Sequence, residues 1–148
     1  MGLFVYGRSY IEENALRFLC RQDSPGKKIE WETDVIPERT KPEKVTLIFA
    51  GGLGNVTEPK TDGFMLEMNG KELLKFDLPQ PSEWKSEDGN ATLKFDIKTS
   101  DASGWYGVFT LTIPGENLPA GKGVRLGVRS LGKGSSRWFS LNPYTNFE

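Results

Sequence analysis

The stretch EWETD, residues 30–34, places three carboxylates at alternate positions of a predicted strand. Side chains two residues apart in a strand share a face, so Glu30, Glu32 and Asp34 would line one surface. Retaining glycosidases need an acid and a nucleophile about 5–5.5 Å apart, which neighbours on one strand face permit. Because this is a single carboxylate set, we expect a solvated strand face and no catalysis.

Composition limits the enzymatic chemistry that the chain can perform. The sequence has no histidine and one cysteine, Cys20. Histidine-based triads, two-histidine zinc sites and an internal disulfide are therefore excluded. We expect neither hydrolase nor lyase activity.

Four aromatic residues are candidates for ligand contact. In SSRWFSLNPY, residues 135–144, alternation points Phe139 and Leu141 to one face and Trp138 to the other, with Ser140. Exposed Trp and Tyr rings supply the flat apolar surface that pyranose rings stack on. The candidates are Trp138 by alternation, Trp84 by its position in a polar loop, Tyr106 on a polar strand face, and Tyr144 in a terminal loop. The alternative for each ring is burial beneath a second layer of chain.

Charged residues near these aromatics form a second group of candidates. Arg125 and Arg129 share one predicted strand face, and Arg137 precedes Trp138. An arginine fork suits bidentate contact with the carboxylate of a uronic acid, which would indicate an anionic glycan. Another predicted strand carries Lys94, Asp96 and Lys98. The alternative is a solvated sheet face with cross-strand ion pairs.

Two loops carry oxygen-rich side chains that a structural calcium ion could use. They contain Asp88 and Asn90 in SEDGNAT, and Asp101 and Ser103 in TSDASG. The same residue types also stabilise turns, so we expect turns and no cofactor, with a structural calcium ion as the alternative. Asn55-Val56-Thr57 and Asn90-Ala91-Thr92 match the N-glycosylation sequon, which is short enough to arise by chance.

The overall charge and hydropathy bear on partners. Nineteen basic and twenty acidic residues leave a formal net charge of −1, so we expect no nucleic-acid partner. No apolar run reaches the roughly 18 residues of a membrane helix, so we expect no membrane partner either. The start, MGLFVYGRSY, lacks the pattern of a secretory signal, which places any export signal outside this sequence.

Short alternating runs separated by turn residues begin near residue 27 and predict an all-β antiparallel sandwich of about eight or nine strands. The Asn69-Gly70 pair joins two such runs and predicts a tight type I′ hairpin. The stretch YIEENALRFLCRQ is compatible with a helix or a strand, and we favour a strand over residues 15–21. We expect one domain over residues 1–148, and residues 1–24 have the weakest sequence pattern. The side chains expected to face the core are Ile29, Trp31, Thr33, Val45, Leu47, Phe49, Phe64, Leu66, Met68, Leu74, Phe76, Leu78, Leu93, Phe95, Ile97, Trp105, Phe109, Leu111, Ile113, Val124, Leu126, Val128, Phe139 and Leu141.

Five stretches follow one another along the chain: MNGKELLKFD, DGNATLKF, GVFTLTIP, LPAGKGVRLGVR and SSRWFSL. Their order resembles the β-sandwich, jelly-roll accessory domains of secreted carbohydrate-active enzymes, of the galactose-binding-like and carbohydrate-binding-module kind. The resemblance covers about residues 29–142 and lies in strands and turns. It implies an extracellular or periplasmic module that binds a polysaccharide or oligosaccharide through exposed aromatics, or packs against a neighbouring catalytic domain. A non-catalytic glycan-binding module is our first hypothesis, a structural or protein-docking sandwich the second, and a small glycan-cleaving enzyme the third.

Overall fold

A computed structural model describes residues 3–10, 19–21, 28–33, 44–54, 63–77, 82–102, 104–115, 118, 121–131 and 138–142, and gives backbone alone for 3–10, 19–21 and 142. These residues form eleven β-strands and no α-helix. No helix in this part of the chain is long and apolar enough to cross a membrane. The strands are β1 Leu3–Tyr10, β2 Leu19–Arg21, β3 Lys28–Thr33, β4 Lys44–Gly54, β5 Phe64–Met68, β6 Lys71–Phe76, β7 Glu83–Lys85, β8 Thr92–Ser100, β9 Gly104–Pro114, β10 Arg125–Ser130 and β11 Trp138–Asn142.

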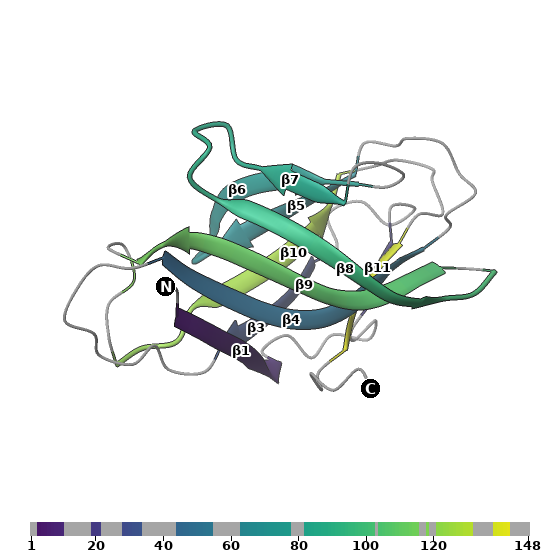
Figure 1. The fold of residues 1–148 in the computed structure, drawn as a ribbon, viewed down its shortest axis with the longest axis horizontal. Coiled ribbons are helices and arrows are strands. Elements are labelled where there is room, and N and C mark those ends of the chain that lie inside the picture. The colour runs from purple at the N-terminus through teal and green to yellow at the C-terminus, as the bar shows by residue number, and fades with distance from the viewer. Residues whose placement is uncertain are drawn as a thin grey trace.

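The strands form two layers, as Figure 1 shows, which confirms the predicted all-β sandwich. Sheet A contains β7, β8, β9 and β4 in that order, and β11 with β2 extends it beyond the second half of β4. Sheet B contains β6, β5, β10 and β3. Two of the eleven strands, β2 and β7, have only three residues, so nine longer strands remain, in agreement with the predicted number.

Strand β1 joins the two sheets and was not predicted from the sequence. Its first half pairs with β4 in parallel, from Leu3 opposite Val45 to Tyr6 opposite Ile48. Its second half pairs with β3 in antiparallel, from Gly7 opposite Thr33 onward, and the register shifts between Gly7 and Ser9. Such an irregularity bends a strand, which lets β1 pass from one sheet to the other. The strand predicted over residues 15–21 appears in the described part as β2.

The core lies between the sheets and is formed by the side chains that alternation assigned to it. Nearly all of the predicted inward residues are buried, from Ile29 and Trp31 in β3 to Phe139 and Leu141 in β11. Met68 and Trp105 are partly buried against this core. Leu78 lies outside the described residues.

Ile97 is the exception to the inward alternation, and its predicted burial is wrong. Its side chain is 39% exposed, although Leu93 and Phe95 on the same strand are buried. The register of β8 against β9 shifts between Ile97 and Thr99, and β8 is exposed from Asp96 to its end. The strand therefore continues beyond the part of the sandwich that the core fills.

The β5–β6 hairpin has the predicted turn. Both central residues have positive φ, 52° at Asn69 and 83° at Gly70, as a type I′ turn requires. The Asn69 side-chain oxygen also accepts a hydrogen bond from the backbone N–H of Arg125, at 3.1 Å. The hairpin is thereby attached to the neighbouring strand β10.

We expect Gly70→Val to lower the free energy of unfolding by about 1–3 kcal/mol, because a β-branched residue is strained at positive φ. A Cβ at this position would meet no atom within 4 Å, so the cost is conformational and not steric. Urea denaturation measures it, with Lys71→Val on the adjacent exposed strand position as the control. Equal stability of the two variants would contradict the turn assignment.

Candidate functional site

Trp138 begins β11 and lies on the outer face of sheet A, away from the core. Phe139 and Leu141, its neighbours in alternation, are buried, whereas Trp138 is half-buried. The prediction that Trp138 is at least partly exposed is therefore confirmed. One edge of the indole ring packs against the sheet, close to Gly54 and Gly104.

Glycines of β4 and β9 form the floor beneath the Trp138 ring. A Cβ placed on Gly54 would overlap the indole atoms Cε2, Cζ2 and Nε1, and one placed on Gly104 would lie 2.8 Å from Cη2. The ring therefore occupies space that any other residue at Gly54 would fill. Sequence reasoning missed this role, although the run GGLG at residues 51–54 was the available signal.

Tyr106 of β9 lies beside Trp138 on the same face. The two ring centroids are 6.0 Å apart and the ring planes are inclined by 36°. Tyr106 is also half-buried and packs over Gly52, where a Cβ would lie 2.6 Å from its Cδ1. Two aromatic side chains, from β9 and from β11, thus meet above the glycines of β4; we call Trp138, Tyr106, Gly52, Gly54 and Gly104 the aromatic platform.

Trp84 does not belong to this surface, and its predicted loop position is wrong: it is a half-buried residue of a strand. It lies in the short strand β7 opposite Leu93, whose side chain is completely buried. The Trp84 ring packs on Phe76 with centroids 5.7 Å apart. Pairing of β7 with β8 turns Trp84 inward, so that it closes the margin of the core.

The structure separates the arginines from the aromatic platform. Arg125 and Arg129 lie on the outer face of sheet B, because Leu126 and Val128 of the same strand point into the core. The aromatic platform lies on the outer face of sheet A, on the opposite side of the sandwich. The arrangement therefore offers no support for these two arginines as partners of a sugar stacked on Trp138.

Arg129 is instead part of an ion network across sheet B. Its Nε donates to Glu67 Oε2 at 2.9 Å and its Nη2 to Glu72 Oε2 at 2.6 Å. Lys28 Nζ donates to Glu67 Oε1 at 3.2 Å and lies 3.5 Å from Glu30 Oε2. Glu67, only 7% exposed, is the centre of this network. Cross-strand pairing, the alternative for these charges, is thus the arrangement found for Arg129.

Glu67 should make the stability of the protein depend on pH. Burial by itself would raise the pKa of Glu67, but hydrogen bonds from Arg129 and Lys28 outweigh burial and hold the pKa below its ordinary value of 4.5. A carboxyl whose folded-state pKa is lowered stabilises the fold above its unfolded-state pKa, and this contribution is lost as pH falls through the folded-state pKa. We expect Glu67→Gln to flatten the loss of unfolding free energy between about pH 5 and pH 2.

Urea denaturation at a series of pH values measures this slope. Glu32→Gln is the matched control, because Glu32 lies on the same face and is exposed. The control should keep the wild-type slope. An unchanged slope in Glu67→Gln would show that the network does not govern acid stability.

Two members of the predicted carboxylate set, Glu30 and Glu32, lie on the same outer face of sheet B. Glu30 takes part in the ion network through Lys28, and Glu32 is opposite Arg125 in the register of β3 against β10. Asp34 lies outside the described residues.

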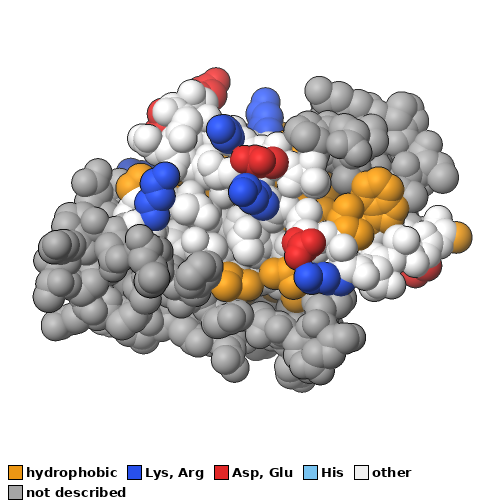
Figure 2. Space-filling model, viewed as in Figure 1, with side chains coloured by type: hydrophobic (Ala, Val, Ile, Leu, Met, Phe, Trp, Pro, Cys, Tyr) orange, Lys and Arg blue, Asp and Glu red, His pale blue; other side chains and the backbone are white. Residues whose placement is uncertain are grey.

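Sheet A carries the other predicted charges: Lys94 is exposed on β8, and Lys98 Nζ lies 2.7 Å from Asp96 Oδ2. Figure 2 shows charged side chains gathered over this part of sheet A.

The two oxygen-rich loops form turns in the structure. Ser86 Oγ donates to Asp88 Oδ1 at 2.6 Å, and the backbone N–H of Asn90 donates to the same oxygen at 2.9 Å. The hydrogen bond from Ser86 is the main cause of a lowered pKa of Asp88. Asp101 Oδ1 likewise accepts the backbone N–H of Gly104 at 2.9 Å. The described residues contain no cluster of three or more metal-ligating side chains.

Several predicted residues lie outside the described part of the chain, namely Tyr144, Arg137, Ser103 and Asn55-Val56-Thr57.

Comparison of the chain with protein-family models, with curated proteins and with solved structures found no match.

Proposed function

We propose that this protein is a non-catalytic glycan-binding β-sandwich and that the aromatic platform is its binding surface. The observation that supports this most directly is the meeting of Trp138 and Tyr106, both half-buried, above glycines of the outer face of sheet A. Neither ring is needed to fill the core. Two adjacent rings on a sheet surface fit an extended ligand better than a compact one.

The chemistry of the aromatic platform suits the apolar C–H face of a pyranose ring. Indole and phenol rings provide flat apolar area, and hydroxyls of neighbouring strands, such as Ser140 and Thr110, lie on the same face of sheet A. Each ring contributes about 0.5–1.5 kcal/mol beyond area burial, and a flexible glycan loses entropy when it is held. The proposed interaction is therefore of modest affinity, as in an accessory module that concentrates substrate near an enzyme.

The setting that we propose is a module of a larger extracellular or periplasmic polysaccharide-degrading protein, with the catalysis in a neighbouring domain. The pairing of Glu30 with Lys28 supports a non-catalytic role, because it ties one of the candidate carboxylates into the ion network of sheet B. The positions of Arg125 and Arg129 on the opposite face favour recognition by stacking over a bidentate arginine contact.

Trp138→Ala tests the proposal after a glycan array has identified a ligand. We expect binding to weaken by about 1–3 kcal/mol, as at an aromatic hot spot. The stability cost should stay below the roughly 3–5 kcal/mol of a fully buried Trp. Titration calorimetry and urea denaturation of the same variant separate the two effects.

Trp84→Phe is the matched control, because it alters a tryptophan at the core margin on another part of the sandwich. It should leave glycan binding unchanged. Absence of glycan binding over the whole array would reject the proposal and leave the aromatic platform as a docking surface for a neighbouring domain. Unweakened binding by Trp138→Ala would place the glycan elsewhere.

A further inference from the structure

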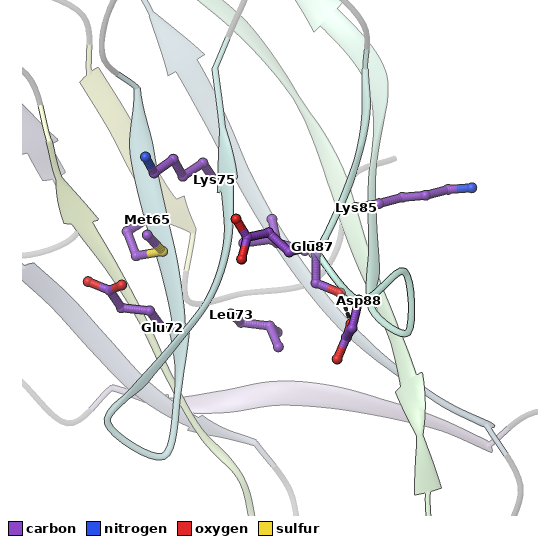
Figure 3. A pocket seen from close by; sticks show the side chains of 9 residues that line it. Met65, Glu72, Leu73, Lys75, Lys85, Glu87 and Asp88 are labelled. Atoms are coloured by element: carbon purple, nitrogen blue, oxygen red, sulfur yellow. Dashed lines mark hydrogen bonds between the residues drawn. The ribbon is translucent and has the colours of Figure 1, made fainter.

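A groove of about 620 Å³ opens at the edge of the sandwich, away from the aromatic platform. One wall is β6, the edge strand of sheet B. The other wall is the segment Lys85–Asp88, which starts at the last residue of β7 in sheet A and continues into the following turn. Figure 3 shows the groove between these two segments. Its volume lies within the roughly 300–1,000 Å³ of ligand sites.

The groove is wedge-shaped because the two sheet edges meet at one end only. At that end Phe76 of β6 and Trp84 of β7 are in ring contact, with centroids 5.7 Å apart. Toward Glu72 and Asp88 the edges diverge. In the described part of the chain neither β6 nor β7 has a strand neighbour on the side that faces the groove. An edge strand in this position presents backbone N–H and C=O groups to a ligand.

A bulge in β6 supplies the apolar floor. The register of β5 against β6 shifts between Leu66 and Glu67, which leaves Leu73 as the extra residue between Leu74 and Glu72. A bulge redirects the side chain of the extra residue, and Leu73 lines the groove half-buried, next to Leu74. The bulge also interrupts regular pairing, so that the edge suits a short segment better than a long strand of a second molecule.

The groove lining carries both signs of charge: Lys75 and Lys85 are basic, and Glu72, Glu87 and Asp88 are acidic. The carboxylates lie on the side where the edges diverge. Glu87 points its carboxylate into the space beside Leu73, whereas Lys85 directs its ammonium group away (Figure 3). Asp88 lies next to Glu87 and is ionised more readily than usual because Ser86 donates to it. Glu72 is already paired with Arg129. A basic group is thus complementary to Glu87 and Asp88 across an apolar floor.

The described side chains that line the groove include no aromatic ring, which separates it chemically from the aromatic platform. Stacking of a sugar is therefore not what this groove provides. We propose that it binds a short, extended peptide segment that adds to the edge of β6, with an apolar residue over Leu73 and a basic residue toward Glu87. The segment from Glu72 to Lys75 offers four residues, roughly 13 Å of strand at 3.3 Å per residue.

The test uses blocked hexapeptides that alternate Thr and Val, with either Lys or Glu at the third position. Titration into the 15N-labelled full chain should shift the backbone amides of Leu73 and Leu74 by nuclear magnetic resonance. We expect the Lys peptide to bind at least about tenfold more tightly than the Glu peptide. A Lys peptide that is N-methylated along the edge-facing backbone should lose this binding, because strand addition requires its N–H groups.

Glu87→Lys should reverse the preference between the two peptides, and Glu83→Lys should not, although it changes the net charge equally on the exposed face of β7. Trp138→Ala should leave peptide binding intact, so failure of this proposal and failure of glycan binding are distinguishable. Four results would each overturn the proposal: no shift at millimolar peptide, equal effects of the two charge reversals, shifts of the same amides by a neutral oligosaccharide, or a dimer that Glu87→Lys dissociates.

Discussion

Phe109→Ala is expected to lower the free energy of unfolding by about 3–5 kcal/mol, the range for removal of a buried aromatic ring. Phe109 is completely buried and lies in the middle of β9. Its ring stacks on Phe95 of β8 at 4.2 Å and on Phe49 of β4 at 5.1 Å, with planes inclined by only 6° and 7°. The three rings form a ladder across the inner face of sheet A.

The same ring also joins the two layers. Phe109 meets Phe76 of sheet B edge-on at 6.1 Å, and Phe139 of β11 at 5.6 Å. Truncation to Ala would remove contacts with four aromatic neighbours and leave a cavity that strands paired on both sides cannot close. A loss near the upper end of the range is therefore expected.

Urea denaturation with a common m-value measures the effect. Thr110→Ala is the control, since Thr110 is the next residue of β9 and faces outward, half-buried. Its cost should stay below about 1 kcal/mol. A loss of less than about 1.5 kcal/mol in Phe109→Ala would mean that the aromatic ladder is not the centre of the core.

Gly54→Ala should displace the Trp138 ring, because the added Cβ would overlap the indole. We expect a loss of about 1–3 kcal/mol in unfolding free energy, as for overpacking at a close contact. If the aromatic platform binds glycan, the same variant should lose binding about as much as Trp138→Ala does, although no ligand-contacting side chain has been removed.

Tryptophan fluorescence, urea denaturation and glycan titration of Gly54→Ala measure the three consequences. Gly127→Ala is the matched control, on the outer face of sheet B, where a Cβ would approach Glu30 Cγ no closer than 3.3 Å. Gly127→Ala should change the free energy of unfolding by less than about 1 kcal/mol. Unaltered fluorescence and stability in Gly54→Ala would show that the indole does not rest on this glycine.

Much of the fold follows from local patterns that need no tertiary information. Two-residue alternation assigned the buried side chains of β3, β4, β9, β10 and β11, because a half-buried strand repeats its environment every second residue. The Asn69-Gly70 turn followed from the tolerance of these two residues for positive φ. Alternation also placed Trp138 outside the core.

Alternation was insufficient wherever pairing was irregular or a strand was short. Ile97 was assigned to the core because a bulge between Ile97 and Thr99 cannot be seen in a regular two-residue pattern. Trp84 was assigned to a loop because β7 has three residues and is defined by its partner β8. Strand β1 was missed because it serves two sheets in turn, in parallel with β4 and in antiparallel with β3.

The sequence by itself determined which face of its own strand each side chain takes, since that depends only on backbone geometry. It could not determine which strands lie side by side, because pairing brings together residues that are far apart in the chain. Only the tertiary structure placed Trp138 beside Tyr106 over Gly54, and Arg129 beside Glu67 on the opposite side of the sandwich. It likewise created the groove between β6 and β7, since a space between two sheet edges exists only after both sheets have formed.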